Sequence, residues 1–345
     1  MGWSLDRFKG VKLRAAKALG INRVTLDRKI VEHGLTVQRG KGLVEAVAAG
    51  RFAVTAECGP PKSADGTVIA EKTKLLRGFV DAVNITDNQT AVVRVCSLAS
   101  AVTAQQHGVE AIMQMTCRDR NRLAMQADIL GAATLGIKNV LCLTGDHISF
   151  GNHPQARGVH DLDSLNLLKM YKDMRDEKKF QCGEEMAVAP ALYIGCAENP
   201  FGDPFELRAL RLKRKIEAGA DFVQTQCIFN LPKFKRWMEE VRALGLHQEV
   251  KILAGLTPIK SAGMANYMKK SVPGMDVPQE IVDRIAAQEK GPPQQAEGKR
   301  LAVEMIKELA EIEGVAGVHI MAVEWEPAVP EIVEAAGLLP RPATA

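Results

Sequence analysis

Short apolar runs alternate with longer segments of helical periodicity from residue 50 almost to the end of the chain. The runs are nearly continuous in apolar residues, which is typical of parallel strands covered by helices. They predict eight strands, at 52–57, 82–86, 111–116, 139–144, 187–194, 222–226, 251–255 and 317–322. Helical spacing is clearest over 119–135, 204–218, 231–244 and 298–313. This α/β pattern favours a (β/α)8 TIM barrel over an open doubly wound sheet, because no GxGxxG motif follows the first strand.

The first 48 residues differ from the rest, being basic and helical in pattern. We predict a helical N-terminal extension at 1–48 and a barrel domain at 49–345. The stretch RAAKALGINRVTLDRKIVEHGL (14–35) resembles the helix-turn-helix of Fis-type DNA-binding proteins. Asp27 and Glu32 dilute the positive charge that phosphate contacts require. Packing on the barrel or on a partner is therefore favoured over DNA binding.

Two predicted loops are longer than simple connectors. Residues 147–162 follow the fourth strand and hold three of the seven histidines. Loops after the strands build the active site of a barrel, so this segment is a candidate lid. The proline-rich segment 271–297 is interpreted as a surface excursion between the last two strands.

Composition narrows the class of protein. The net charge of +4 is spread along the chain, which favours small anionic ligands and gives no reason to expect a nucleic-acid partner. No apolar stretch approaches the ~20 residues that cross a bilayer, and the N-terminus lacks a signal-peptide core. The seven cysteines include no CxxC pair, and the histidines form no metal motif. We expect a cytoplasmic protein without a membrane partner or a bound metal.

Carboxylates and amides stand at the predicted strand ends, where barrel enzymes place catalytic groups. Glu57 ends the first strand, and burial there raises a carboxyl pKa and suits a general acid. Asp146 follows a glycine after the fourth strand and can accept hydrogen bonds from ring N–H groups. Gln226 and Gln224 share one face of the sixth strand and suit the edge of a pterin-like ring. Each has a structural alternative. Glu57 could form a salt bridge at the rim, Asp146 could belong to an ordinary turn, and one of the glutamines could bond neighbouring strands.

Four further residues are weaker candidates. Thr86 and Thr116 end the second and third strands and can bind a ring carbonyl or a phosphate, or serve as ordinary rim residues. Lys215 lies on the helix before the sixth strand and can hold a phosphate or point to solvent. His319, alone in an apolar strand, is interpreted as a core residue.

Taken in order, several segments resemble the methylenetetrahydrofolate reductase family. They are TAECGPP, VNITDN, MTCRDR, GIKNVLCLTGD, LRLKRKIEAGADFVQTQCIF, ILAGLTPIKS and GVAGVHI, and they extend from about residue 50 to residue 322. The resemblance implies a flavin-binding barrel of one-carbon metabolism that reduces 5,10-methylenetetrahydrofolate to 5-methyltetrahydrofolate, which supplies methionine biosynthesis. Hydride passes from N5 of the reduced flavin to an iminium carbon.

The resemblance also implies roles for individual residues. Glu57 matches the family's general acid, and Asp146 matches the aspartate near the flavin and pterin rings. Gln226 matches the folate-binding glutamine, with Gln224 beside it. Thr86 and Lys215 match flavin-contacting positions.

Three departures mark a divergent bacterial member. Thr144 stands where well-known members carry arginine, Gln114 where they carry histidine, and Asn199 near a third family histidine. These positions surround the flavin, so we count Thr144 and Asn199 among the cofactor-binding residues, together with Thr116 at the end of the third strand. FAD is the expected cofactor and FMN the alternative, as in distant members that work with a zinc-containing partner subunit.

The electron donor and the assembly stay open at this stage. The donor is NAD(P)H or an electron-delivering partner subunit, and a homo- or hetero-oligomer is expected. Two other readings compete with the reductase. One is a pterin-dependent methyl-transfer barrel without flavin, and the other is a non-catalytic DNA-binding or scaffold protein.

Overall fold

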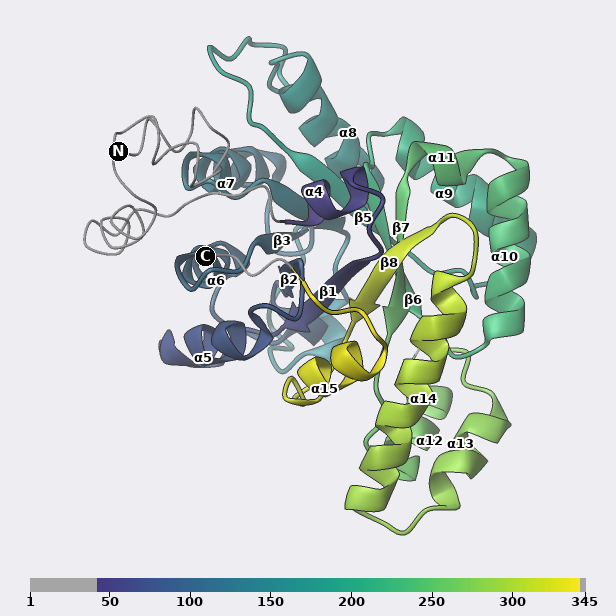
Figure 1. Cartoon of the computed structure of the whole chain (residues 1–345). Coiled ribbons are helices and arrows are strands. Elements are labelled where there is room, and N and C mark those ends of the chain that lie inside the picture. Colours follow the sequence, from purple (N-terminus) through teal and green to yellow (C-terminus); the bar gives the residue numbers. More distant parts are fainter. Residues whose placement is uncertain (1–41, 273, 342–345) are drawn as a thin grey trace, which may run out of the picture.

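Eight parallel strands close into a barrel in the computed structural model, which describes residues 42–272 and 274–341 (Figure 1). Each strand pairs in parallel with the next along the chain, and the last pairs with the first. The strands are β1 (Ala53–Cys58), β2 (Ala82–Ile85), β3 (Ala111–Thr116), β4 (Asn139–Leu143), β5 (Tyr193–Glu198), β6 (Phe222–Cys227), β7 (Lys251–Leu256) and β8 (Val315–Ile320). The predicted (β/α)8 barrel is confirmed.

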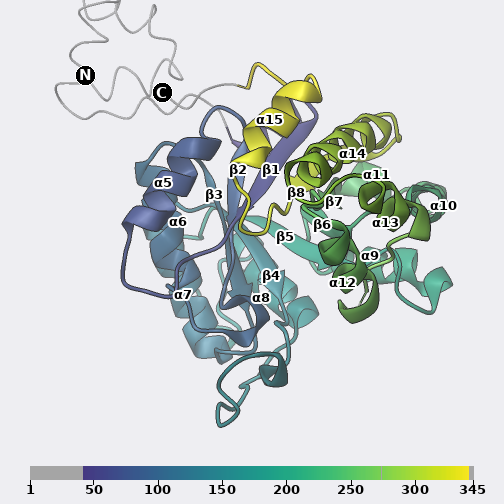
Figure 2. The ribbon, with the colours of Figure 1, turned by 90° about the horizontal axis from the view of Figure 1, so that it is seen from below.

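Helices surround the strands on the outside of the barrel (Figure 2). They are α5 (Thr67–Leu76), α6 (Ser97–Gln106), α7 (Arg122–Thr134), α8 (Ser164–Asp176), α9 (Arg208–Glu217), α10 (Leu231–Ala243), α11 (Leu246–Glu249), α12 (Ala262–Ser271), α13 (Gln279–Ala286), α14 (Pro292–Ala310) and α15 (Ala328–Ala335). Short 3-10 turns lie at Gln89–Ala91, Ile148–Phe150 and Phe205–Leu207. None of the helices within the described ranges is long and apolar enough to span a membrane.

The predicted elements differ from the structure mainly in two places. The fifth strand was expected at 187–194, but β5 begins at Tyr193, three residues after Pro190. Proline lacks the N–H that a strand ladder needs, so the apolar run before Tyr193 forms a loop. The proline-rich segment 271–297 is not a surface excursion, because it forms α13 and the first turn of α14. Pro292 and Pro293 start α14, where the missing N–H groups would have no helical partner.

The lower end of the barrel, where the strands begin, is closed by apolar side chains. A helix that precedes the barrel, α4 (Leu43–Ala48), buries Leu43 and Ala46 against inward-facing residues of the strands. The residues of this closed end are Leu43, Ala46, Ala53, Ala82, Ile112, Leu141, Phe222 and Leu253. Gly195 leaves room for the ring of Phe222, since a Cβ there would lie 2.2 Å from it. The polar cavity therefore has an apolar floor beneath it.

This helix falls within the predicted N-terminal extension, 1–48. The segment from Leu43 packs with the barrel, and the backbone N–H of Leu43 donates to Glu110 Oε1 at 2.9 Å. The rest of the predicted extension, including the helix-turn-helix-like stretch, lies outside the described residues.

Candidate active site

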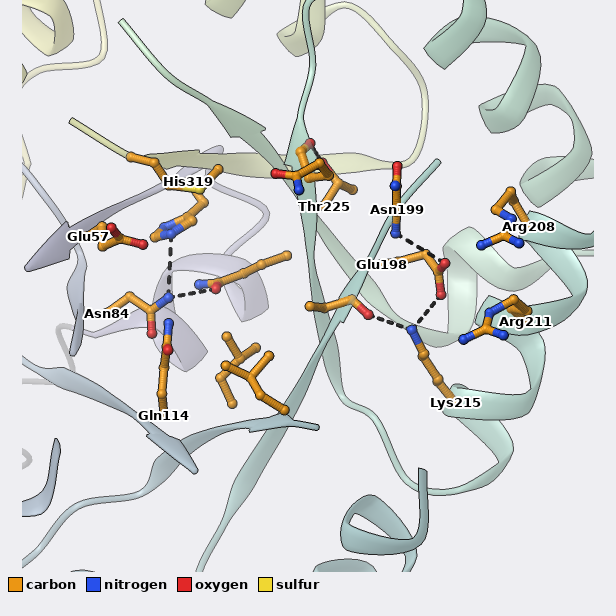
Figure 3. Close-up of a pocket in the computed structure, with 16 residues that line it drawn as sticks. Glu57, Asn84, Gln114, Glu198, Asn199, Arg208, Arg211, Lys215, Thr225 and His319 are labelled. Atoms are coloured by element: carbon orange, nitrogen blue, oxygen red, sulfur yellow. Dashed lines mark hydrogen bonds and ion pairs between the residues drawn. The ribbon is translucent and has the colours of Figure 1, made fainter. Parts of the chain in front are cut away.

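A cavity of about 330 Å3 lies inside the upper half of the barrel, toward the carboxyl ends of the strands (Figure 3). Inward-facing residues recur every second position of a strand, and on two strands the residue above the apolar floor is an amide. Asn84 follows Ala82 on β2, and Gln224 follows Phe222 on β6. The lining residues are Glu57, Asn84, Gln114, Leu141, Leu143, Ala197, Glu198, Asn199, Arg208, Arg211, Lys215, Gln224, Thr225, Gln226, His319 and Met321.

The cavity's polar end gathers Glu57, Asn84, Gln114 and His319 (Figure 3). Asn84 Nδ2 donates to Gln224 Oε1 at 2.8 Å and lies 3.4 Å from His319 Nε2. His319 Nδ1 lies 2.9 Å from the Thr55 hydroxyl. Burial lowers the pKa of His319 to about 3, so the imidazole is neutral. With Asn84 donating to Nε2, the ring proton belongs on Nδ1.

Two buried polar atoms of this cluster have no hydrogen-bond partner within residues 42–272 and 274–341. They are Asn84 Oδ1, an acceptor, and Gln224 Nε2, a donor. Leaving such atoms unpaired costs free energy, so a ligand that satisfies them gains affinity. A neighbouring donor and acceptor suit the amide-like edge of a heterocyclic ring.

Glu57 lies at the end of β1, half-buried at the edge of the cavity. Burial raises the pKa of its carboxyl from the ordinary 4.5 to about 7. A hydrogen bond from Gln89 Nε2 to Oε1, at 3.3 Å, opposes this rise, whereas the negative charge of Glu326 adds to it. Lys72 and Arg94 also favour the ionised form. A carboxyl with this pKa can release and regain a proton near neutral pH.

The opposite end of the cavity carries positive charge (Figure 3). Arg208, Arg211 and Lys215 come from α9, where the i, i+3 and i+7 spacing places them on one face. Lys215 Nζ pairs with Glu198 Oε2 at 2.6 Å and donates to the backbone O of Ala197. Because Glu198 compensates Lys215, the two arginines supply the excess positive charge for an anionic group.

Five residues predicted from the sequence meet in this cavity. They are Glu57, Asn199, Lys215, Gln224 and Gln226. Gln226 Oε1 accepts from the backbone N–H of Cys227 at 3.0 Å, and Asn199 Oδ1 accepts from that of Phe201 at 2.9 Å. Their side-chain amide nitrogens are the groups that remain for a ligand.

The other four predicted residues do not line the cavity. Thr86 is buried beside it, and the Thr116 hydroxyl donates to Asp87 Oδ2 at 2.9 Å. Thr144 is exposed and accepts from the backbone N–H of Ser164 at 3.1 Å. Asp146 is exposed at the barrel mouth.

The contacts of Asp146 tie two loops together rather than point into the cavity. Its Oδ2 accepts from the backbone N–H of Thr90 at 3.1 Å. The loop 147–162, the candidate lid, begins at the next residue. The histidines of this loop do not line the cavity. Near its far end, the backbone N–H of Val159 donates a hydrogen bond to the backbone O of Arg118 at 2.7 Å.

Cavity residues that were not proposed from the sequence include Asn84, Glu198, Arg208 and Arg211. Asn84 could have been found from the candidate Thr86, because it lies two positions earlier and side chains two positions apart along a strand share a face. Arg208 and Arg211 could have been found from their spacing to Lys215 on one helix. Glu198 was missed because the fifth strand was expected to end at residue 194, whereas β5 ends at Glu198. His319, expected in the core, is buried but reaches the cavity.

Comparison with protein families gives two matches. The model described as methylenetetrahydrofolate reductase matches residues 43–337, and the one described as bacterial regulatory protein, Fis family, matches residues 4–33. The second match overlaps the helix-turn-helix-like stretch, outside the described residues.

Curated relatives are similar at low identity. The chain is 25% identical to a "probable methylenetetrahydrofolate reductase (NADPH)" of Caenorhabditis elegans, over 67% of this chain and 33% of that protein. It is 27% identical to methylenetetrahydrofolate reductase 2 of Saccharomyces cerevisiae, over 68% and 37%. It is 25% identical to 5,10-methylenetetrahydrofolate reductase of Pectobacterium carotovorum, over 61% and 66%. The chain thus spans about a third of the length of the first two relatives.

Among solved structures, the chain resembles a Clostridium thermocellum protein described as binding two copies of 5-methyl-5,6,7,8-tetrahydrofolic acid. The TM-score is 0.58 at 14% identity, over 86% of this chain and all of that one. An EDTA monooxygenase of a Chelativorans species gives a TM-score of 0.51 at 12% identity, over 85% and 95%. At these identities the likeness concerns the fold.

Proposed function

The chain belongs to the methylenetetrahydrofolate reductase family, and from this premise we propose that it reduces 5,10-methylenetetrahydrofolate to 5-methyltetrahydrofolate. The observation that carries the proposal is Glu57, a carboxyl with a pKa of about 7 at the edge of the barrel cavity. Opening the five-membered folate ring needs a proton on the departing nitrogen. A half-buried carboxyl of this pKa supplies it near neutral pH.

The proton moves from the Glu57 carboxyl to the ring nitrogen as the C–N bond breaks. The folate carbon is left as an iminium ion, and Glu57 becomes a carboxylate. Gln226 and Gln224 bind the pterin, and the unpaired Gln224 Nε2 supports this assignment. Asp146 remains a catalytic candidate through its place at the barrel mouth, although its side chain is engaged with Thr90 in this structure.

The cavity fits a flavin by two observations. Asn84 Oδ1 is a buried acceptor without a partner among the described residues, and it suits an N–H group of a heterocyclic ring. Arg208 and Arg211 at the other end suit a phosphate group. When bound, a flavin supplies the hydride that reduces the iminium carbon. Asn199, Lys215 and the two arginines would hold it.

We further propose that the protein acts in the cytoplasm, in one-carbon metabolism, with FAD or FMN and with NAD(P)H or a partner subunit as donor. Thr86, Thr116 and Thr144 are kept as flavin contacts. None of them lines the cavity, so a direct contact needs a local rearrangement. The mass of the released cofactor distinguishes FAD from FMN.

The test is to purify the chain and record its visible spectrum before and after reduction. A flavin spectrum that bleaches with NADH or reduced methyl viologen and recovers with methylenetetrahydrofolate supports the reductase. Recovery after viologen but not NADH bleaching indicates a partner subunit as donor. A colourless protein that reduces no folate after reconstitution with FAD or FMN contradicts the proposal, and folate binding without reduction would favour methyl transfer.

A further inference from the structure

A second, smaller cavity adjoins Glu57 on the barrel's upper rim. It has a volume of about 110 Å3 and lies between the segment after β1, helix α5 and the segment between β8 and α15. Glu57 is the one residue that lines both this cavity and the larger one, as far as the described residues go. The carboxyl therefore stands at the partition between the two spaces.

The smaller cavity contains an ion pair and reaches the surface. Lys72 Nζ pairs with Glu326 Oε1 at 2.5 Å and donates to the backbone O of Gly59 at 3.3 Å. The Glu326 side chain is only 9% exposed, so this ion pair is largely buried. Val323 and Glu324, on the rim, are exposed. The volume accommodates several water molecules, which have polar partners there.

If Glu57 acts as the general acid, its carboxyl needs access to water from a side that the substrate does not cover. Each turnover leaves it as a carboxylate, and a proton must return before the next folate ring can open. A folate ring bound in the larger cavity would cover that side of the carboxyl. Water can then approach the carboxyl from the smaller cavity.

We propose that the smaller cavity is the route by which solvent returns a proton to Glu57, and that the Lys72–Glu326 ion pair is a positioning pair for this carboxyl. The inference rests on the proposed function. The balance is simple: Glu57 gives one proton to the departing nitrogen, hydride supplies two electrons to the iminium carbon, and bulk water returns one proton to the carboxylate.

The two members of the Lys72–Glu326 pair shift the pKa of Glu57 in opposite directions. Glu326 raises the pKa of Glu57, whereas Lys72 and Arg94 lower it. Burial raises the pKa of the Cys58 and Cys227 thiols to about 12. It lowers the pKa of the His319 imidazole to about 3. These three groups are uncharged near neutral pH, so the ionic groups facing Glu57 from the described elements are Lys72, Arg94 and Glu326.

The first experiment titrates Glu57 in the ligand-free protein by carboxyl carbon NMR, with its resonance assigned by its loss in Glu57→Gln. We expect Glu326→Gln to lower the midpoint, because a negative neighbour is removed, and Lys72→Met to raise it. Glu334→Gln and Lys74→Met, at exposed positions of α15 and α5, are matched controls and leave it unchanged. Shifts in the same direction, or none, would overturn the positioning role, since loss of structure cannot produce opposite signs.

The second experiment narrows the cavity with Val68→Phe, a half-buried position in its wall. In flavin-reduced protein held at pH 6, Glu57 is protonated before mixing, so the first turnover keeps its rate. Later turnovers are expected to slow roughly tenfold and to gain a solvent deuterium effect. Val68→Ile, which fills less space, gives an intermediate result.

Equal slowing of the first and later turnovers, or no slowing, would overturn the route. If the wild-type protein reduces no folate, the proposed function fails and the route fails with it. The titration still reports whether the ion pair acts on Glu57, so the two failures are distinguishable.

Discussion

Glu57 and Glu198 are both glutamates near strand ends in one cavity, but their partners differ. Lys215 lies 2.6 Å from Glu198 and compensates its charge. Glu57 has a single hydrogen bond, from a neutral amide at 3.3 Å, among the contacts of the described residues. Burial raises the pKa of Glu57, the carboxyl without a cation in contact, to about 7, and this difference in partners distinguishes the two glutamates.

Replacing Glu57 with glutamine should leave the cavity shape unchanged and remove the proton. We expect folate reduction to fall by about 10²–10⁴-fold, with flavin reduction by the donor unaffected. Stopped-flow measurement of the two half-reactions checks this, with Glu71→Gln, an exposed position on α5, as the control. Equal loss in both half-reactions would contradict the role of general acid.

Replacing Gln226 with alanine should mainly weaken folate binding, because the side-chain N–H groups that face the cavity are removed. One lost hydrogen bond corresponds to roughly a tenfold weaker Kd. Calorimetric titration of the oxidised protein with 5-methyltetrahydrofolate measures it, with Gln248→Ala on the surface of α11 as the control. An unchanged Kd would remove Gln226 from the folate site.

At the scale of elements, periodicity located the strands because buried parallel strands are continuous apolar runs. It failed before β5, where an apolar run containing Pro190 forms a loop, and at α13, where prolines before and after a helix resembled a loop. Position at a strand end led to Glu57 and Gln226, which line the cavity. It could not show that the Thr116 hydroxyl donates to Asp87 or that Asp146 accepts a hydrogen bond from the backbone N–H of Thr90, because these contacts depend on loop packing.

Gly195 on β5 is required by the packing of the apolar end. An alanine there places its Cβ against the Phe222 ring, and we expect a loss of about 1–3 kcal/mol in the free energy of unfolding. Gly131→Ala is the matched control, since nothing lies within 4 Å of its Cβ position in α7 and alanine favours a helix by about 0.5–1 kcal/mol. Urea unfolding measures both. Equal changes in the two variants would show that the Phe222 contact does not determine the residue.

At the scale of the whole molecule, the inside of the barrel divides into an apolar end and a polar end that carries the site. Helix α4 belongs to the first, because it covers the lower opening with Leu43 and Ala46. The family match also begins at residue 43. We therefore propose that the structural unit begins at α4, before the boundary predicted at residue 49.

Two truncated chains test this boundary, one starting at residue 42 and one at residue 50. Both lack residues 1–41, so their difference belongs to α4. The shorter chain exposes the lower apolar cluster, and we expect its free energy of unfolding to be at least about 2 kcal/mol lower. Urea unfolding of the two chains provides the comparison. Equal stabilities would mean that α4 only rests on the barrel.

The pairing of β8 with β1 has a consequence for assembly. An open sheet presents an edge strand whose free N–H and C=O groups can pair with another molecule. The eight strands of this barrel present none, so copies of the chain or a partner subunit cannot join it by extending the sheet. Any oligomer that involves the barrel must be built through its outer helices and loops. The surfaces that select a partner can therefore change without altering the strands that form the cavity.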